Sequence, residues 1–179
     1  MATVLAALDN SLAANPVLVA ARALARALGD RLQAIHVLGE GVGAAESAAR
    51  AAGVPLRLAS GPVVERLIEA GEDEDVAAMV IGARGTIASS RTLGSSALAV
   101  VTSLRKPVVV VPPGAEVAPR LRHALVPLEE KTSSILAPRS TVELAPAGQV
   151  DVIVLLIDGG QEDENSAPEV LSRFCPWGI

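Results

Sequence analysis

The sequence predicts an α/β protein: a doubly wound parallel sheet of five strands in the order 3-2-1-4-5, followed by a partial second copy of the same unit. Three observations predict this. Short apolar runs alternate with helical patterns over the first two thirds of the 179 residues, a proline- and glycine-rich break follows, and a strand pattern then recurs. Alternating strands and helices are typical of parallel sheets, and right-handed crossovers leave few strand orders.

Five apolar runs have the length and composition of buried strands. They cover residues 3–8, 32–38, 54–58, 76–81 and 107–111, and helical patterns connect them at 15–28, 44–52, 62–70 and 95–104. We expect Asn15 to cap the first helix, with Pro16 at its first position, where the missing N–H costs nothing. Gly71 is expected to end the third helix.

A break near residue 114 separates the two parts of the chain. Proline and glycine in the segment PPGAEVAP cannot continue a central strand. We therefore predict a first domain over residues 1–114, a linker over 115–121 and a partial second unit over 122–179. The net charge of −5 arises wholly beyond Gly114, where ten acidic and five basic side chains stand.

The second unit is predicted from a repeat. A shift of 120 residues lays 124–129 on 4–9 and 152–157 on 32–37 without a gap. On this register Glu129 replaces Asp9, Pro138 interrupts the intervening helix, and a short helix is expected over 166–174. Nothing equivalent to residues 82–96 follows, so this unit is expected to bind no nucleotide and to pack against the first unit or a partner subunit. Chance similarity in a chain rich in valine, leucine and alanine is the alternative.

The candidate site lies where the winding of the sheet reverses, because ligands bind there at the carboxyl ends of the strands. Asp9 follows the first strand, Gly82-Ala83-Arg84-Gly85 follows the fourth, and Gly94-Ser95-Ser96 opens the last helix. Glycines admit a ligand close to the backbone, and a helix N-terminus favours phosphate. Ser95, Ser96 and Arg84 can donate hydrogen bonds to it. These residues describe a triphosphate cradle.

Each of these residues also has a structural interpretation. Asp9 could cap its own turn, the glycines could be ordinary turn residues, and Arg84 and Arg91 could be solvated loop charges. His36, between Ile35 and Val37 in a strand, is interpreted as structural.

The combination of these motifs resembles the universal stress protein family over residues 2–113. The shared features are Gly82-x-x-Gly85, Gly94-Ser95, the PVVVVP strand, Asp9, and His36-Val37. The resemblance implies a Rossmann-like sheet that binds ATP in many members, with Mg²⁺ held through the phosphates. By the same resemblance, Asp9 and the backbone of Val37 would meet the adenosine, Gly82 the ribose, and Gly85, Gly94 and Ser95 the phosphates. Two features depart from the family pattern: eight residues instead of nine separate Gly85 from Gly94, and the segment over 39–43 is short.

The predicted function is a nucleotide-responsive stress or signalling protein that binds ATP. One alternative is an interaction module of the same fold without nucleotide binding, and another is a weak ATP hydrolase. No Gly-x-x-x-x-Gly-Lys-Ser/Thr loop is present, so dedicated catalysis is not expected. The fifth strand should lie at the sheet edge, which predicts a homodimer across residues 108–111. The rival is that the second unit covers this edge.

Composition excludes several other classes. No apolar run approaches the roughly 20 residues that cross a bilayer, and the first residues lack the basic and longer apolar segments of a secretion signal, so we expect none. The single cysteine, Cys175, cannot form an internal disulfide, so we expect a cytoplasmic protein. Aromatic residues make up only 1% and the net charge is negative, which argues against a nucleic-acid partner.

Overall fold

The computed structural model describes residues 1–11, 13–39, 43–83, 93–129 and 150–157. The chain divides into two compact units, Met1–Arg120 and Leu121–Ile179. This division falls inside the segment where the sequence predicts a linker. Near the end of the first unit, Ala115 N donates to Pro112 O at 3.2 Å, and Gly114 has a φ of 71°, a turn that favours glycine.

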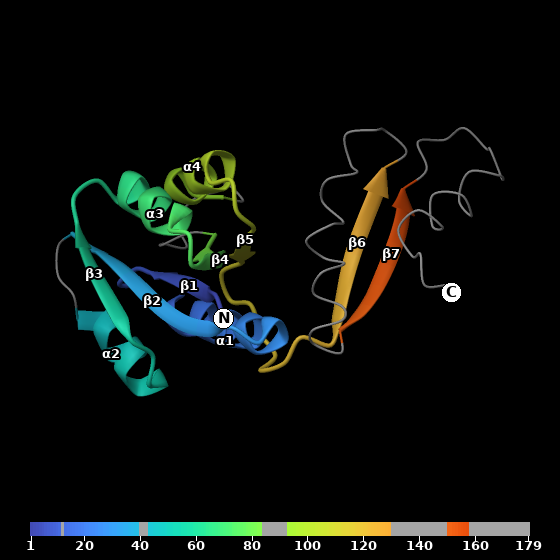
Figure 1. Ribbon diagram of the computed structural model, residues 1–179, viewed down its shortest axis with the longest axis horizontal. Helices are drawn as coiled ribbons and strands as arrows, with labels where there is room; N and C mark the ends of the chain where they lie inside the picture. The colour runs from blue at the N-terminus through green and yellow to red at the C-terminus, as the bar shows by residue number, and fades with distance from the viewer. Residues whose placement is uncertain (12, 40–42, 84–92, 130–149, 158–179) are drawn as a thin grey trace. The chain divides into compact units, whose positions relative to one another are not determined.

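The first unit contains a five-stranded parallel sheet in the order β3-β2-β1-β4-β5 (Figure 1), which confirms the predicted topology. Its strands are β1 (Thr3–Leu8), β2 (Arg31–Leu38), β3 (Leu56–Ser60), β4 (Val76–Gly82) and β5 (Val108–Val111). Its helices are α1 (Ala14–Leu28), α2 (Gly43–Ala52), α3 (Val63–Glu72) and α4 (Ser95–Ser103).

Helices cover both faces of this sheet. α3 and α4 pack on one face and α1 and α2 on the other (Figure 1). Leu5, Ile35 and Met79 project from neighbouring strands toward α3 and α4, and each is at most 1% exposed. Successive side chains of a strand alternate between faces, so a parallel sheet covered on both sides reads as a continuous apolar run. This is why β1 is buried along its whole length.

The predicted start of α1 was wrong. Ala13 is the N-cap, and Asn15 and Pro16 both lie in the first helical turn. The serine before the helix explains the difference, because Ser11 O accepts from Ala14 N and Ser11 Oγ accepts from Ala13 N at 3.1 Å. Pro16 is tolerated because the first four N–H groups of a helix have no intrahelical partner.

The predicted start of β3 was early by two residues. Gly53 N donates to Arg50 O and Val54 N to Ala49 O, and Gly53 has a φ of 62°. This pair of bonds is a Schellman motif, so Val54 belongs to the end of α2 rather than to the strand.

Gly71 does not end α3, contrary to the prediction. It is buried within the helix, which continues to Glu72. A methyl group at Gly71 would lie 2.8 Å from both Leu104 Cδ1 and Met79 Cε. The glycine therefore allows the helix to approach β4 and the end of α4 closely.

The second unit contains a parallel pair of strands, β6 (His123–Glu129) and β7 (Asp151–Ile157). Its register repeats that of the first two strands of the chain: Thr3 pairs with Arg31, and His123 pairs with Asp151, each residue number being 120 higher. The main-chain bond before each pair also recurs, from Arg31 N to Ala2 O and from Asp151 N to Arg122 O. Pro138 and the helix expected over 166–174 lie outside the described residues.

No helix in the described ranges combines the length and apolar character needed to cross a membrane.

Candidate functional site

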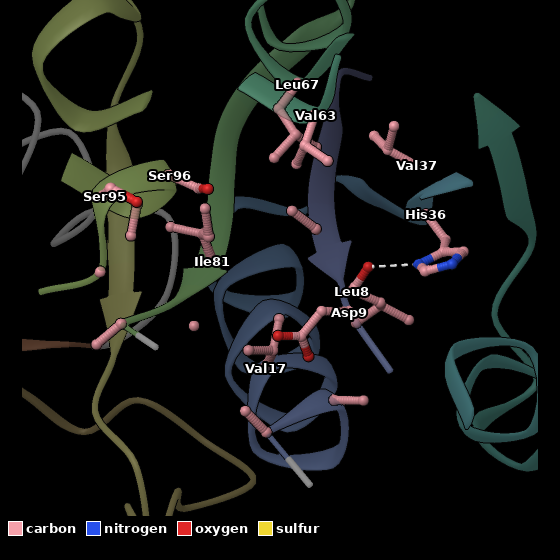
Figure 2. A pocket seen from close by; sticks show the side chains of 17 residues that line it. Leu8, Asp9, Val17, His36, Val37, Val63, Leu67, Ile81, Ser95 and Ser96 are labelled. Carbon is pink, nitrogen blue, oxygen red and sulfur yellow. Dashed lines mark hydrogen bonds between the residues drawn. The ribbon is translucent and has the colours of Figure 1, made fainter. Parts of the chain in front are cut away.

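A pocket of about 320 Å³ opens at the carboxyl ends of β1 and β4, where the winding of the sheet reverses (Figure 2). This volume is at the lower end of the roughly 300–1,000 Å³ that small-molecule sites occupy. Six of the residues predicted from the sequence line it: Asp9, Val37, Gly82, Gly94, Ser95 and Ser96. Arg84, Gly85 and Arg91 lie outside the described residues.

One wall of the pocket is apolar. It is formed by Val63 and Leu67 of α3, Val37 of β2 and Ile81 of β4 (Figure 2). Sequence analysis did not identify Val63, Leu67 or the α1 residue Val17 as pocket residues. Val63 and Leu67 form an apolar face at the start of α3, which could have indicated a buried surface. The sequence does not show which strand ends lie beneath this face.

Asp9 combines both interpretations considered from the sequence. Its Oδ1 accepts hydrogen bonds from Ser11 N at 3.0 Å and Ser11 Oγ at 2.5 Å, so the carboxylate caps its own turn. Asp9 also lines the pocket and is exposed. The turn uses Oδ1 only, and thus fixes the direction of the carboxylate without consuming Oδ2.

The main chain of Val37 faces the pocket end of β1. Arg31 N donates to Ala2 O on the β1 side, whereas Ala34 N donates to Pro55 O on the β3 side. Because the hydrogen-bonding side alternates along a strand, the N–H and C=O of Val37 point toward β1. The last residue of β1, Leu8, pairs with His36, so the Val37 carbonyl extends past the end of that strand.

The opposite side of the pocket is formed by the start of α4. Gly94 is the N-cap, with its N–H donated to Ala83 O at 2.8 Å and its carbonyl accepting from Leu98 N at 2.9 Å. The N–H groups of Ser95, Ser96 and Ala97 precede the first intrahelical bond, and among the described residues no side-chain cap is found at this helix start. Such a helix start concentrates donors and partial positive charge, which favours an anion.

The conformation of Gly94 does not require glycine. Its φ of −70° and ψ of 157° lie in the β region open to every L-residue. Gly94 lines the pocket, and backbone strain does not account for a glycine there.

The described lining of the pocket contains one carboxylate, Asp9, and no lysine or arginine. Within the described ranges, no group of three or more His, Cys, Asp or Glu residues could hold a metal ion.

These features define the class: an α/β domain with a small-molecule pocket at the switch point of a doubly wound sheet. Residues 39–112 match the model of the universal stress protein family. This match confirms, over residues 39–112, the resemblance to that family found in the sequence. The matched segment includes the start of α4 but begins after Asp9 and Val37.

Solved structures share this fold. A universal stress protein in complex with cAMP is 24% identical, with a TM-score of 0.50 over 62% of this chain and 96% of its own. The hypothetical protein MJ0577 is 19% identical, with a TM-score of 0.51 over 64% of this chain and 98% of its own. A universal stress protein from Archaeoglobus fulgidus is 25% identical, with a TM-score of 0.48 over 62% and 97%. No curated protein matches the sequence.

Proposed function

We propose that the first unit binds an adenine nucleotide, ATP with Mg²⁺, and that the protein acts as a nucleotide-responsive stress or signalling protein. One observation carries this proposal. A single pocket at the switch point brings together Asp9 and Val37 from the first two strands with Gly82, Gly94 and the serines of α4.

Each part of the pocket suits a different part of the nucleotide. The apolar wall of Val37, Val63 and Leu67 suits the adenine ring, and the Val37 carbonyl can accept a hydrogen bond from its amino group. Asp9 can accept from a ribose hydroxyl. The phosphates would meet the start of α4, where the N–H groups and hydroxyls of Ser95 and Ser96 can donate. Mg²⁺ would neutralise phosphate charge through the phosphate oxygens.

Among the similar structures, the cAMP complex supports an adenine nucleotide as the ligand class. It also makes cAMP the most useful competitor in a binding assay. Displacement of ATP by cAMP would show that the two nucleotides compete for the same pocket.

An interaction module without nucleotide binding is the second candidate. The observation that favours it is the absence of lysine and arginine from the described lining, since many phosphate sites use such cations. A weak ATP hydrolase is the third, and release of ADP from bound ATP would reveal it.

The assembly and organisation predicted from the sequence are part of the proposal. β5 is an edge strand, paired with β4 on one side, and Val109 is 37% exposed. An apolar edge can pair with the same strand of another chain, which supports a homodimer across residues 108–111. A cytoplasmic location is also part of the proposal. The shared register of β1–β2 and β6–β7 supports a partial second copy over residues 122–179.

Isothermal titration calorimetry of the full chain with ATP and Mg²⁺ tests the binding proposal. Gly94→Val should fold, because its φ and ψ suit valine, and should weaken ATP affinity at least tenfold by filling the phosphate side. Gly43→Val is the matched control, since a side chain there meets nothing within 4 Å and Gly43 is not in the pocket lining. No binding by the wild type at millimolar ATP would refute the proposal.

A further inference from the structure

His36 is, with Thr3, one of two polar residues among the buried residues that the structure describes. It lies on β2 with an exposed fraction of 4%, and it belongs to the lining of the pocket. A buried polar group is retained at low cost only when it is hydrogen-bonded. The partners of such a group therefore indicate what the residue does, and one partner of His36 is described.

The bond from His36 reaches the end of β1. Its Nδ1 lies 2.8 Å from the carbonyl oxygen of Leu8 (Figure 2). A carbonyl oxygen can only accept, so Nδ1 carries the hydrogen. The ladder pattern also directs the N–H of Val37 toward Leu8. The Leu8 carbonyl is thus the point where the last residue of β1 is joined to β2.

The groups on either side of this bond are those assigned to the adenosine. Asp9 directly follows Leu8, and Val37 directly follows His36. The turn after Leu8 is held at two further places, by Ser11 on Asp9 Oδ1 and by Ala45 N donating to Asn10 Oδ1 at 3.2 Å. The Leu8 carbonyl belongs to the planar peptide unit that joins Leu8 to Asp9, so a displacement of this carbonyl would move the Asp9 carboxylate relative to the Val37 carbonyl.

We propose that His36 is a positioning residue for the nucleotide pocket: its Nδ1–H holds the Leu8 carbonyl, and through it sets the distance between Asp9 and the main chain of Val37. This role rests on the proposed nucleotide binding. His36 acts through Leu8 and requires no contact with the nucleotide.

Two substitutions in the full chain separate the hydrogen bond from the bulk of the ring. His36→Leu fills the space of the imidazole ring with an apolar side chain but removes the N–H donor. His36→Asn is smaller, but its amide can place an N–H near the position of Nδ1. We expect His36→Leu to weaken ATP affinity about tenfold in calorimetry and His36→Asn to weaken it less than threefold.

A purely structural role would give the opposite order, because asparagine leaves a cavity and leucine does not. Equal affinities for both variants and wild type would overturn the proposal, as would weaker binding by His36→Asn than by His36→Leu. Circular dichroism shows whether His36→Leu folds. If it does not fold, His36→Asn decides the question: a folded His36→Asn that retains ATP affinity would support the positioning role. A loss of ATP affinity of tenfold or more in His36→Asn would overturn that role.

A spectroscopic readout in the wild type distinguishes this inference from the function on which it rests. The Nδ1–H proton of His36 should be observable by NMR in the free protein, and its exchange with solvent should slow at least tenfold when ATP binds. ATP binding without any slowing would overturn the positioning role alone. An absence of ATP binding would overturn the proposed function itself.

Discussion

The β1–β2 and β6–β7 pairs have the same register, yet they differ sharply in how their side chains are covered. Leu5 of β1 is 1% exposed, whereas Leu125, at the equivalent place in β6, is 61% exposed. Leu5 packs in the cluster formed with α3 and α4. The comparison teaches that parallel pairing aligns equivalent side chains but does not by itself bury them, and that in the first pair the burial comes from helices packed on the sheet.

The two pairs also differ in the residues at their carboxyl ends. Where the first pair has Asp9, His36 and Val37, the sequence of the second has Glu129, Leu156 and Ile157. Leucine has no donor for the carbonyl at the end of the preceding strand. The second pair thus keeps a carboxylate and a main-chain carbonyl at equivalent positions but has leucine in place of His36, which makes equivalent positions natural controls for each other.

The largest expected effect is on stability, at the two equivalent leucines. Leu5→Ala should lower the free energy of unfolding by about 2–5 kcal/mol, because it leaves a cavity in a closed core. Leu125→Ala should change it by less than about 0.5 kcal/mol, since that side chain is mostly exposed. Urea denaturation of the full chain, followed by circular dichroism, measures both.

A cost at Leu125 as large as that at Leu5 would break this contrast. It would show that the exposed face of β6 is covered in solution by a partner or by another part of the chain.

The second effect concerns ligand affinity, at the residues that end the equivalent strands. Asp9→Ala should weaken ATP binding by about 1–3 kcal/mol through loss of a hydrogen bond to the nucleotide. Glu129→Ala should leave the affinity unchanged. Calorimetry on both variants tests the contrast, and a matching loss in Glu129→Ala would assign nucleotide binding to the second unit.

The smallest effect is expected at the sheet edges, where the comparison extends to β5 and β3. Val109→Lys should weaken the proposed dimer about fivefold, or about 1 kcal/mol, because like charges would face each other across the paired edges. Leu58→Lys, on the opposite edge strand, is the control, since Leu58 is already 51% exposed. Light scattering across a micromolar dilution series measures the dissociation, and a monomeric wild type would refute the dimer.

Topology was the most predictable part of the fold. The strand order followed from five apolar runs with helical connections, and β1 has the bounds expected from its sequence. Element ends were less predictable because they depend on particular hydrogen bonds. Ser11, rather than Asn15, organises the start of α1, and the Schellman bonds after α2 take Val54 out of β3.

The polar side of the candidate site could be inferred from sequence because it consists of strand ends and a helix start, which topology brings together. The apolar wall could not. Val63 and Leu67 reach the pocket through the way α3 packs across the sheet, and sequence spacing does not determine that packing. His36 was correctly assigned to a buried strand, but its bond to Leu8 became visible only in three dimensions.

The close approach at Gly71 also constrains how this sequence can change over evolutionary time. An alanine there would favour the helix by about 1 kcal/mol over glycine, yet its methyl group would meet the side-chain ends of Leu104 and Met79. Both are buried, and Met79 is 0% exposed, so they can yield only by changing rotamer or by being replaced with something smaller. Positions 71, 79 and 104 should therefore drift together, so that a larger residue at one is accompanied by a smaller residue at another.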